Sequence, residues 1–273
     1  MQRSETITQV IKGADLILNF AGPSRLTSLP ALKAAIEARI NYADVADDPE
    51  AIESLTSLNK AVHNAGITAL CGFGVGPGFT NFFSIHGANR MDKVSDIRIA
   101  FAVSLLPRPD DVPGAGITGH RLEQFTSNCV VFRDGKLSYV PGGSEPEMVE
   151  WPKPLGTLES RIMSHPEPIT LPRYIKGIKN VTVKMAYPKR ATELLISLDR
   201  LGLASKTPIE VGEISMTPYH FARYFLRSEV FRQTDTWKGV MEDERAMGPS
   251  MSLRVEIDGE KHKKPVRYIY RFI

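Results

Sequence analysis

Ala69-Leu-Cys-Gly-Phe-Gly-Val-Gly-Pro-Gly-Phe-Thr-Asn81 is the most informative stretch of this sequence. The short apolar segment 67–71 is typical of a buried strand, and the apolar-rich segment 79–91 that follows can form a helix. The alternate glycines between them allow the backbone to approach a ligand closely, and Pro77 stands where a first helical turn tolerates a missing N–H group. The stretch therefore predicts a strand-to-helix turn that could hold a phosphate, a carboxylate or a flat ring.

A purely structural role for this turn stays open, because a glycine-rich connection can simply let two layers pack. The spacing also limits the function. Gly72, Gly74, Gly76 and Gly78 alternate, whereas the pyrophosphate turn of dinucleotide-binding proteins has the spacing G-x-G-x-x-G at the start of a helix. We therefore do not interpret this turn as a dinucleotide fingerprint.

The segments before this turn repeat a helix-and-strand scheme. Residues 15–20 and 40–45 are predicted to be short buried strands, and 1–14, 29–38 and 49–64 are predicted to be helices. Strands that alternate with helices favour an open α/β sheet with parallel crossovers. Ligands of such sheets bind beyond the carboxyl ends of the strands, so the turns that follow residues 19, 44 and 71 mark a candidate crevice.

The pattern changes after residue 91. Residues 94–104 alternate between apolar and polar side chains, which is typical of a half-solvated antiparallel strand. We expect a helix over 117–127, a hairpin at Asp134-Gly135, an extended segment over 162–173 and a last hairpin at Asp258-Gly259. The chain is thus divided into an α/β domain over 1–92 and an α+β domain over 93–273 with a mostly antiparallel sheet.

Composition excludes several classes of protein. The 34 basic residues exceed the 31 acidic ones by three, which gives little reason to expect a nucleic-acid partner. Cys71 and Cys129 have neither zinc-site nor disulfide-scaffold spacing, so no metal is expected. No apolar run has the ~18 residues of a membrane span, and the first residues are too polar for a signal peptide. We expect a cytoplasmic protein.

Three motifs resemble the saccharopine dehydrogenase-like family of NAD(P)-dependent oxidoreductases. They are the strand and A-G-P turn at 14–23, the Y-x-D-x-A segment at 42–46, and the G-x-G-x-x-P-G-x-[ST]-N turn at 72–81. The family resemblance implies a Rossmann-like parallel sheet, NAD or NADP as the cofactor, and hydride transfer to or from the carbon of an imine or secondary amine.

The resemblance also implies roles for residues. Asn19, Ala21, Gly22 and Pro23 would lie along the ribose and nicotinamide of the cofactor, and Gly74, Pro77 and Gly78 would approach the ring. Asp44 would bind a ribose hydroxyl or a substrate amine. Asn19 and Asp44 have a local alternative as well, since Asx side chains commonly cap turns.

An amino-acid-type substrate would need cationic or N–H-rich contacts in the second domain. The candidates are His120, Arg121, His165 and Arg173, and the glycine-rich loop 114–121 is predicted to face the substrate. The two histidines also suit proton transfer, although a lone histidine in a loop is more often structural. No residue is assigned as the catalytic acid or base.

One departure from the family is large. Family members begin with a strand, a G-x-G-x-x-G turn and a helix, and nothing before Asp15 can supply these elements. We therefore expect a fragment or truncated product that is inactive alone. The alternative is a non-catalytic ligand-binding or dimerisation module with the same fold. In either case the antiparallel sheet could pair across a two-fold axis, so a homodimer is expected.

Overall fold

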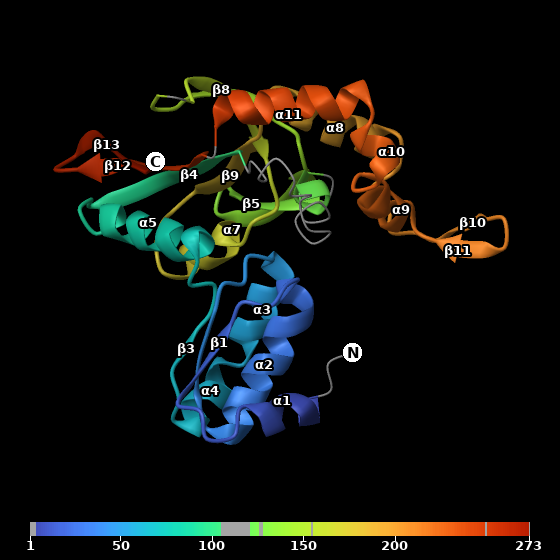
Figure 1. Ribbon diagram of the computed structural model, residues 1–273. Coiled ribbons are helices and arrows are strands. Elements are labelled where there is room, and N and C mark those ends of the chain that lie inside the picture. Colours follow the sequence, from blue (N-terminus) through green and yellow to red (C-terminus); the bar gives the residue numbers. More distant parts are fainter. Residues whose placement is uncertain (1–3, 105–120, 126–127, 154, 249, 273) are drawn as a thin grey trace.

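The computed structural model describes residues 4–104, 121–125, 128–153, 155–248 and 250–272. Figure 1 shows a small sheet with its helices below a larger sheet. The small sheet is parallel and the large one is mixed and mostly antiparallel, as the sequence predicts. Among the described residues, no helix is both long enough and apolar enough to cross a bilayer.

The small sheet has the strand order β1-β2-β3, and consecutive strands pair in parallel. Its apolar core packs α2 and α3 against the strands around the buried ring of Tyr42. The elements of this part are β1 (Leu16–Asn19), β2 (Asn41–Asp44), β3 (Ala69–Leu70), α1 (Ser4–Val10), α2 (Ser24–Ala38), α3 (Pro49–Ser57) and α4 (Asn59–Ala65).

This parallel sheet has an open edge and an open face among the described residues. Strand β1 pairs only with β2, so the outer edge of β1 has no strand beside it. Ile17 packs into the core, whereas Leu16, Leu18 and Leu70 are about half exposed. Parallel sheets are normally covered on both faces, whereas these leucines form an apolar surface that the described residues leave uncovered.

The large sheet has the strand order β13-β12-β4-β9-β5-β6, with the pair β7 and β8 joined through β9. Its central pair, β4 and β9, is parallel. The strands are β4 (Lys93–Ser104), β5 (Asn128–Arg133), β6 (Lys136–Pro141), β7 (Glu147–Glu150), β8 (Thr157–Ile162), β9 (Asn180–Ala186), β12 (Ser250–Lys261) and β13 (Lys264–Phe272).

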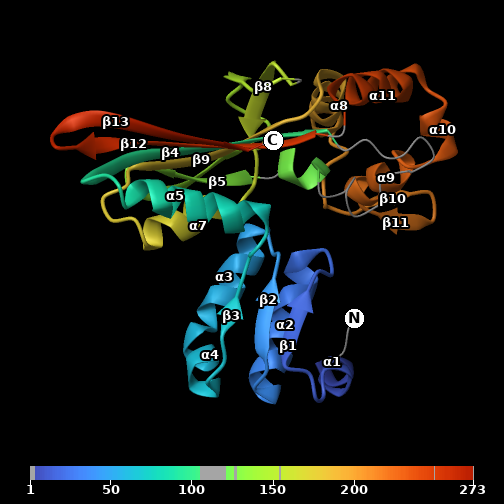
Figure 2. The same cartoon turned by 60° about the vertical axis from the view of Figure 1, so that its left-hand side comes forward.

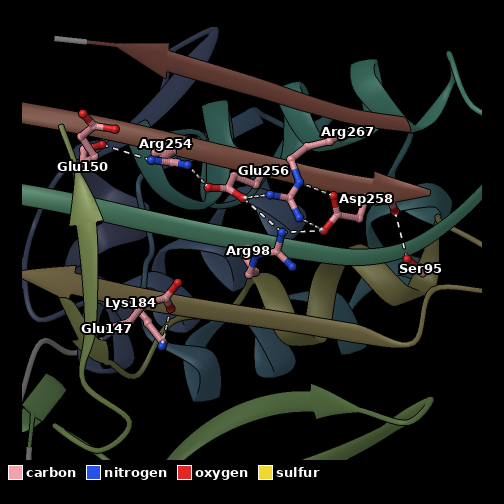
Figure 3. A network of polar contacts seen from close by, with 9 residues as sticks. All are labelled: Ser95, Arg98, Glu147, Glu150, Lys184, Arg254, Glu256, Asp258 and Arg267. Carbon is pink, nitrogen blue, oxygen red and sulfur yellow. Dashed lines mark hydrogen bonds and ion pairs between the residues drawn. The ribbon is translucent and has the colours of Figure 1, made fainter. Parts of the chain in front are cut away.

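Alternation along the strands gives this sheet one apolar face and one face that is partly polar and partly covered by a smaller apolar cluster. The odd positions of β4, such as Ile97 and Ile99, point into the main core. On the other face, the guanidinium of Arg98 donates to Asp258 at 2.5 Å and to Glu256 at 3.1 Å (Figure 3). Arg267 joins the same cluster from β13. The charges neutralise one another across the strands, which allows them to sit on a partly covered surface.

The helices surround the apolar face and one end of the large sheet. Figure 2 shows α5 and α7 between this sheet and the small one, α8 to α11 at one end, and the β12–β13 hairpin reaching beyond the other. The remaining elements are η1 (Val75–Phe79), α5 (Thr80–Ala88), α7 (Glu167–Thr170), η2 (Leu171–Arg173), α8 (Lys189–Arg200), β10 (Ile209–Val211), β11 (Ile214–Met216), α9 (Pro218–Phe225), α10 (Glu229–Arg232) and α11 (Asp235–Met247).

Two local predictions were wrong. The last hairpin turns at His262 and Lys263, both with positive φ, while Asp258-Gly259 lies inside β12, opposite a bulge at Ser95 of β4. Residues 162–173 are also not extended throughout, because they contain α7 and η2. The prolines stand in the first turns of these short helices, where no N–H donor is needed. The expected helix over 117–127 lies partly outside the described residues. Within that range the structure describes residues 121–125, and they are helical.

Candidate functional site

Two strand-end loops of the small sheet line a pocket of about 590 Å³. The turn after β1 contributes residues 19–25, and the turn after β2 contributes 45–48. The opposite wall carries Glu123, Tyr219 and Arg223, which come from beyond the small sheet in the sequence. Two of the three turns that mark the candidate crevice, those after β1 and β2, therefore line this pocket, and residues from much later in the chain close it.

The four predicted residues of the first turn all line this pocket. The side-chain amide of Asn19 donates weakly to Tyr42 Oη at 3.3 Å, and its oxygen accepts the backbone N–H of Ala21 at 3.1 Å. Asn19 is thereby held as the cap of its own turn. Ala21, Gly22 and Pro23 are exposed, and no heavy atom lies within 4 Å of the Cβ position of Gly22. This turn offers open backbone to a ligand.

Asp44 makes the local turn contacts that its sequence position allows. Its side chain is 3% exposed, and one carboxylate oxygen accepts the backbone N–H groups of Gly72 at 2.6 Å and Ala46 at 3.1 Å. The other oxygen accepts the hydroxyl of Tyr42 at 2.7 Å. Burial and this carboxylate raise the pKa of Tyr42, which keeps the phenol a donor. Asp44 joins the two loops from below and does not reach the pocket.

The glycine turn packs directly beside Asp44. Pro77 is buried, and its ring lies 2.7 Å from the Cβ position of Gly72. Gly78 lies against the backbone of Phe73. Gly74, Pro77 and Gly78 are not among the residues that line the two pockets described here, so their approach to a ring stays a prediction. Gly76, in the same turn, lies against the side chains of His165 and Glu167.

Gly76 touches a buried polar pair. A Cβ atom on Gly76 would lie 2.6 Å from His165 Cε1 and 3.2 Å from Glu167 Oε1. His165 Nδ1 and Glu167 Oε2 are 2.5 Å apart, and the other oxygen of Glu167 accepts the hydroxyl of Thr80 at 2.6 Å. His165 and Glu167 are 5% and 0% exposed. The glycine turn, which follows the strands of the small sheet, therefore lies in direct contact with the imidazole of His165.

The pKa of His165 is raised. Burial alone would lower it, but the charge of Glu167 and its hydrogen bond outweigh burial, and the charges of Asp47 and Asp48 act in the same direction. Both aspartates line the 590 Å³ pocket. The imidazole therefore lies within electrostatic range of the strand-end loops.

A second pocket of about 180 Å³ adjoins the first through shared residues. Arg25 Nη1 and Glu123 Oε2 are 3.0 Å apart, and Lys206 Nζ lies 2.8 Å from the other oxygen of Glu123. Burial would raise the pKa of Glu123, but Lys206 and Arg25 lower it. Asp48 accepts the hydroxyl of Ser24 at 2.7 Å. The pocket thus presents carboxylate and cationic groups together.

The remaining predicted substrate residues do not gather here. Arg121 contacts Glu244 at 3.3 Å and lies over the ring of Tyr187, so it belongs to an internal network. Arg173 is exposed on η2 and is not among the pocket-lining residues. His120 lies outside the described residues. Of the three that the structure describes, His165 alone lies next to the strand-end turns.

Sequence reasoning missed Arg25, Asp48, Glu123 and Lys206. Asp48 had a detectable signal, because it follows the second strand at the expected edge, but the other three are paired only by tertiary packing. The fingerprint spacing G-x-G-x-x-G also occurs once, at Gly114-Ala-Gly-Ile-Thr-Gly119. This segment lies in the loop expected to face the substrate, among residues outside the described part, and follows prolines instead of directly following a strand.

The described residues fit one half of a nicotinamide cofactor. The open backbone around Gly22 and a pocket of about 590 Å³ can accommodate a ribose and a flat ring. The helices that begin beside the pocket, α2 and α3, have Pro23 and Asp48 as N-caps. Neither offers the glycine-rich N-terminus that cradles a pyrophosphate.

Comparison with known proteins agrees with this architecture. No protein-family model matches the chain. Apo saccharopine dehydrogenase (L-Glu forming) from Saccharomyces cerevisiae is similar over 99% of this chain and 74% of its own length, with 11% sequence identity and a TM-score of 0.59.

Two further solved structures are more distant. A probable dehydrogenase from Thermotoga maritima matches 97% of this chain with 8% sequence identity and a TM-score of 0.37. GenD2 from gentamicin A biosynthesis, in complex with NAD, matches 98% of this chain with 11% sequence identity and a TM-score of 0.36. The chain spans 59% and 58% of their lengths. Of these three structures, the yeast saccharopine dehydrogenase is the one whose similarity is high enough to define the fold. This chain therefore has the fold of saccharopine dehydrogenase.

Proposed function

We propose that this chain is the substrate-binding part, with half of the cofactor site, of an NAD(P)-dependent oxidoreductase that acts on an amino-acid-type imine or secondary amine. The observation that supports the proposal best is the 590 Å³ pocket at the strand ends, with the exposed turn of Ala21, Gly22 and Pro23 on one wall. The position is the one at which open α/β sheets bind nucleotides.

The nicotinamide would exchange a hydride with the substrate carbon when bound. The chain's own residues would bind and orient the reactants. Asn19 fixes the turn that carries Gly22, and the open Cβ position of Gly22 leaves space for the ring and ribose. Asp44, which the resemblance implied as a ligand residue, holds the two loops together from beneath.

The adjoining 180 Å³ pocket supports an amino-acid-type substrate. An amino acid carries an ammonium and a carboxylate, and this pocket presents Asp48 and Glu123 beside Arg25 and Lys206. These side chains are already paired, so a substrate would exchange one charged partner for another. Such an exchange limits the desolvation cost of a charged ligand.

The open edge of β1 supports the part of the proposal that concerns the pyrophosphate. A strand-turn-helix unit with the G-x-G-x-x-G spacing would extend the parallel sheet at this edge and cover Leu16 and Leu18. The same polypeptide or a partner could provide it. A homodimer is also part of the proposal, because the outer edge of β13 has no strand beside it among the described residues.

Nicotinamide mononucleotide tests the proposal without the pyrophosphate unit, since it carries only the ring, its ribose and one phosphate. Saturation-transfer NMR should detect saturable millimolar binding, which Gly22→Trp should abolish by filling the pocket. Lys60→Ala, an exposed change on α4, is the matched control and should keep the binding. Absence of binding to the wild-type chain would refute the cofactor site and favour a non-catalytic ligand-binding module.

A further inference from the structure

The buried pair of His165 and Glu167 needs an explanation beyond stability. Removing two ionisable groups from water is costly, and apolar side chains of similar volume commonly stabilise a core as well or better. Here Glu167 is fully buried and His165 nearly so, at the junction between the turn 72–78 and the helix α7. A purely structural contact at this junction could be apolar.

The three side chains form a directed chain of hydrogen bonds. Thr80 Oγ1 donates to Glu167 Oε1 at 2.6 Å, and Glu167 Oε2 lies 2.5 Å from His165 Nδ1. Both carboxylate oxygens are thus engaged, and Nδ1 is the nitrogen that faces Glu167. In this orientation His165 Nε2 is left for another partner, and none of the hydrogen bonds among the described residues uses it.

Two observations connect this imidazole with the pocket. Ser164, its neighbour in the chain, lines the 180 Å³ pocket. Gly76 belongs to the strand-end turn and lies so close to His165 that any side chain at position 76 would collide with the ring. The charged groups that act on the imidazole are Glu167 from α7 and Asp47 and Asp48 from the loop after β2, while Phe101 packs against it from β4 at 5.4 Å between ring centroids.

We propose that His165 exchanges the proton of the substrate nitrogen, with Glu167 and Thr80 as positioning residues, an inference that rests on the proposed function.

The proton balance of the step is simple. In the oxidative direction His165 Nε2 takes a proton from the secondary ammonium of the substrate, which leaves a neutral amine with a free electron pair. As the carbon loses its hydride to the oxidised nicotinamide, that pair forms the C=N bond of an iminium ion. The imidazolium keeps the proton and the single positive charge it carries. In the reverse direction the imidazolium returns the proton to the amine nitrogen.

Glu167 has two effects in this step. Its carboxylate orients the ring through Nδ1 and stabilises the imidazolium that forms. Thr80 holds the carboxylate from the opposite side, so the pair does not depend on the substrate for its geometry.

Nitrogen-15 NMR titration of the full chain gives a readout that needs no cofactor. His165 should titrate above the ordinary histidine pKa of about 6.5, and Glu167→Gln should lower that pKa by removing the charge. Thr80→Val is a milder second variant, to be used if Glu167→Gln does not fold. It removes the hydroxyl that donates to Glu167 and should also change the titration of His165. His63, exposed on α4, is the internal control, and its signals should be the same in the wild type and in both variants. An unchanged His165 titration in both variants would overturn the positioning role.

The catalytic part is tested with saccharopine as the probe amine and oxidised nicotinamide mononucleotide as the hydride acceptor. His165→Asn should reduce the rate on the order of 100-fold or more and remove one ionisation from the pH profile, while mononucleotide affinity stays within about twofold. His63→Asn should leave the rate unchanged. If mononucleotide binds but the wild-type chain does not oxidise saccharopine with it, or if His165→Asn keeps the wild-type pH profile, the inference alone is overturned, whereas absent mononucleotide binding would overturn the proposed function.

Discussion

Cys71 stands at the start of the glycine turn, where its thiol is partly accessible but electrostatically unfavourable to ionise. Burial and the carboxylate of Asp44 raise its pKa to about 12. Because the thiolate is the reactive form, we predict that iodoacetamide alkylates Cys71 at pH 8 on the order of a thousand times more slowly than a free cysteine. Mass spectrometry after timed quenching measures this rate directly.

The control for this prediction is the unfolded chain. In urea both Cys71 and the buried Cys129 should react at the rate of an ordinary thiol. Rapid alkylation of Cys71 in the folded protein would mean that Asp44 is not held as a buried anion beside it. That result would also weaken the view of Asp44 as the group that joins the two loops.

At this scale, the sequence located residues better than it assigned their roles. Asn19 and Asp44 both follow strands, and both do lie at the predicted edge. The pattern contains no information on which one turns its polar atoms inward, because that depends on Tyr42 and on the backbone of Gly72. His165 was a candidate, and its partner Glu167 is only two residues away, but Thr80, which donates to Glu167, is 87 residues from it in sequence, beyond the reach of any local rule.

Among the elements, β12 has a specific steric requirement at Gly259, opposite the bulge in β4. A Cβ atom on Gly259 would lie 2.0 Å from the carbonyl oxygen of Lys93 and 2.7 Å from Met91 Sδ. Since the nearest atom is backbone of the neighbouring strand, it has little freedom to move. We predict that Gly259→Ala lowers the free energy of unfolding by about 2 kcal/mol or more, as measured by urea denaturation followed by circular dichroism.

Gly22→Ala is the matched control for the bulge. Its Cβ would meet no heavy atom within 4 Å, so stability should change by less than about 0.5 kcal/mol. Equal stabilities of Gly259→Ala and the wild type would argue against the close approach of β12 and β4 at this point.

The same bulge explains why one element was placed wrongly. Asp-Gly is the strongest short-range hairpin signal, and at Asp134-Gly135 it does mark the turn between β5 and β6. At Asp258-Gly259 the pairing of β12 with β4 continues past the dipeptide with a register shift, and the chain turns later, at His262 and Lys263. The same dipeptide is thus a turn between β5 and β6 but part of a continuous strand in β12, because the long pairing with β4 holds β12 in the sheet beyond it.

For the whole molecule, periodicity was sufficient to predict a parallel sheet followed by a mostly antiparallel one. Continuous apolar strands such as Leu16–Asn19 and alternating ones such as Lys93–Ser104 differ visibly in sequence. The arrangement of the two sheets was not predictable, because it depends on a few distant contacts. Arg25 and Glu123 are 98 residues apart and meet across the pocket.

The ion pair between Arg25 and Glu123 should therefore influence the arrangement of the two halves more than the stability of either. Both side chains are partly buried, at 29% and 14% exposed, and Lys206 holds Glu123 from the other side. We predict that Arg25→Ala increases hydrogen exchange in residues 45–48 and 121–125 with little change in the cores. Coupling to Glu123→Gln in a double-mutant cycle should be about 0.5–1 kcal/mol.

The pH dependence of this contact has a definite sign. Because the pKa of Glu123 is lowered in the folded protein, its contribution is present above the pKa of the unfolded chain and is lost as the pH falls through the lower folded value. Wild-type exchange at the pocket should thus approach that of Arg25→Ala only in strong acid. Arg133→Ala, which breaks an exposed pair with Glu145 away from the pocket, is the control and should leave exchange there unchanged. Equal exchange in wild type and Arg25→Ala at neutral pH would mean that packing of α5 and α7, not this ion pair, keeps the pocket closed.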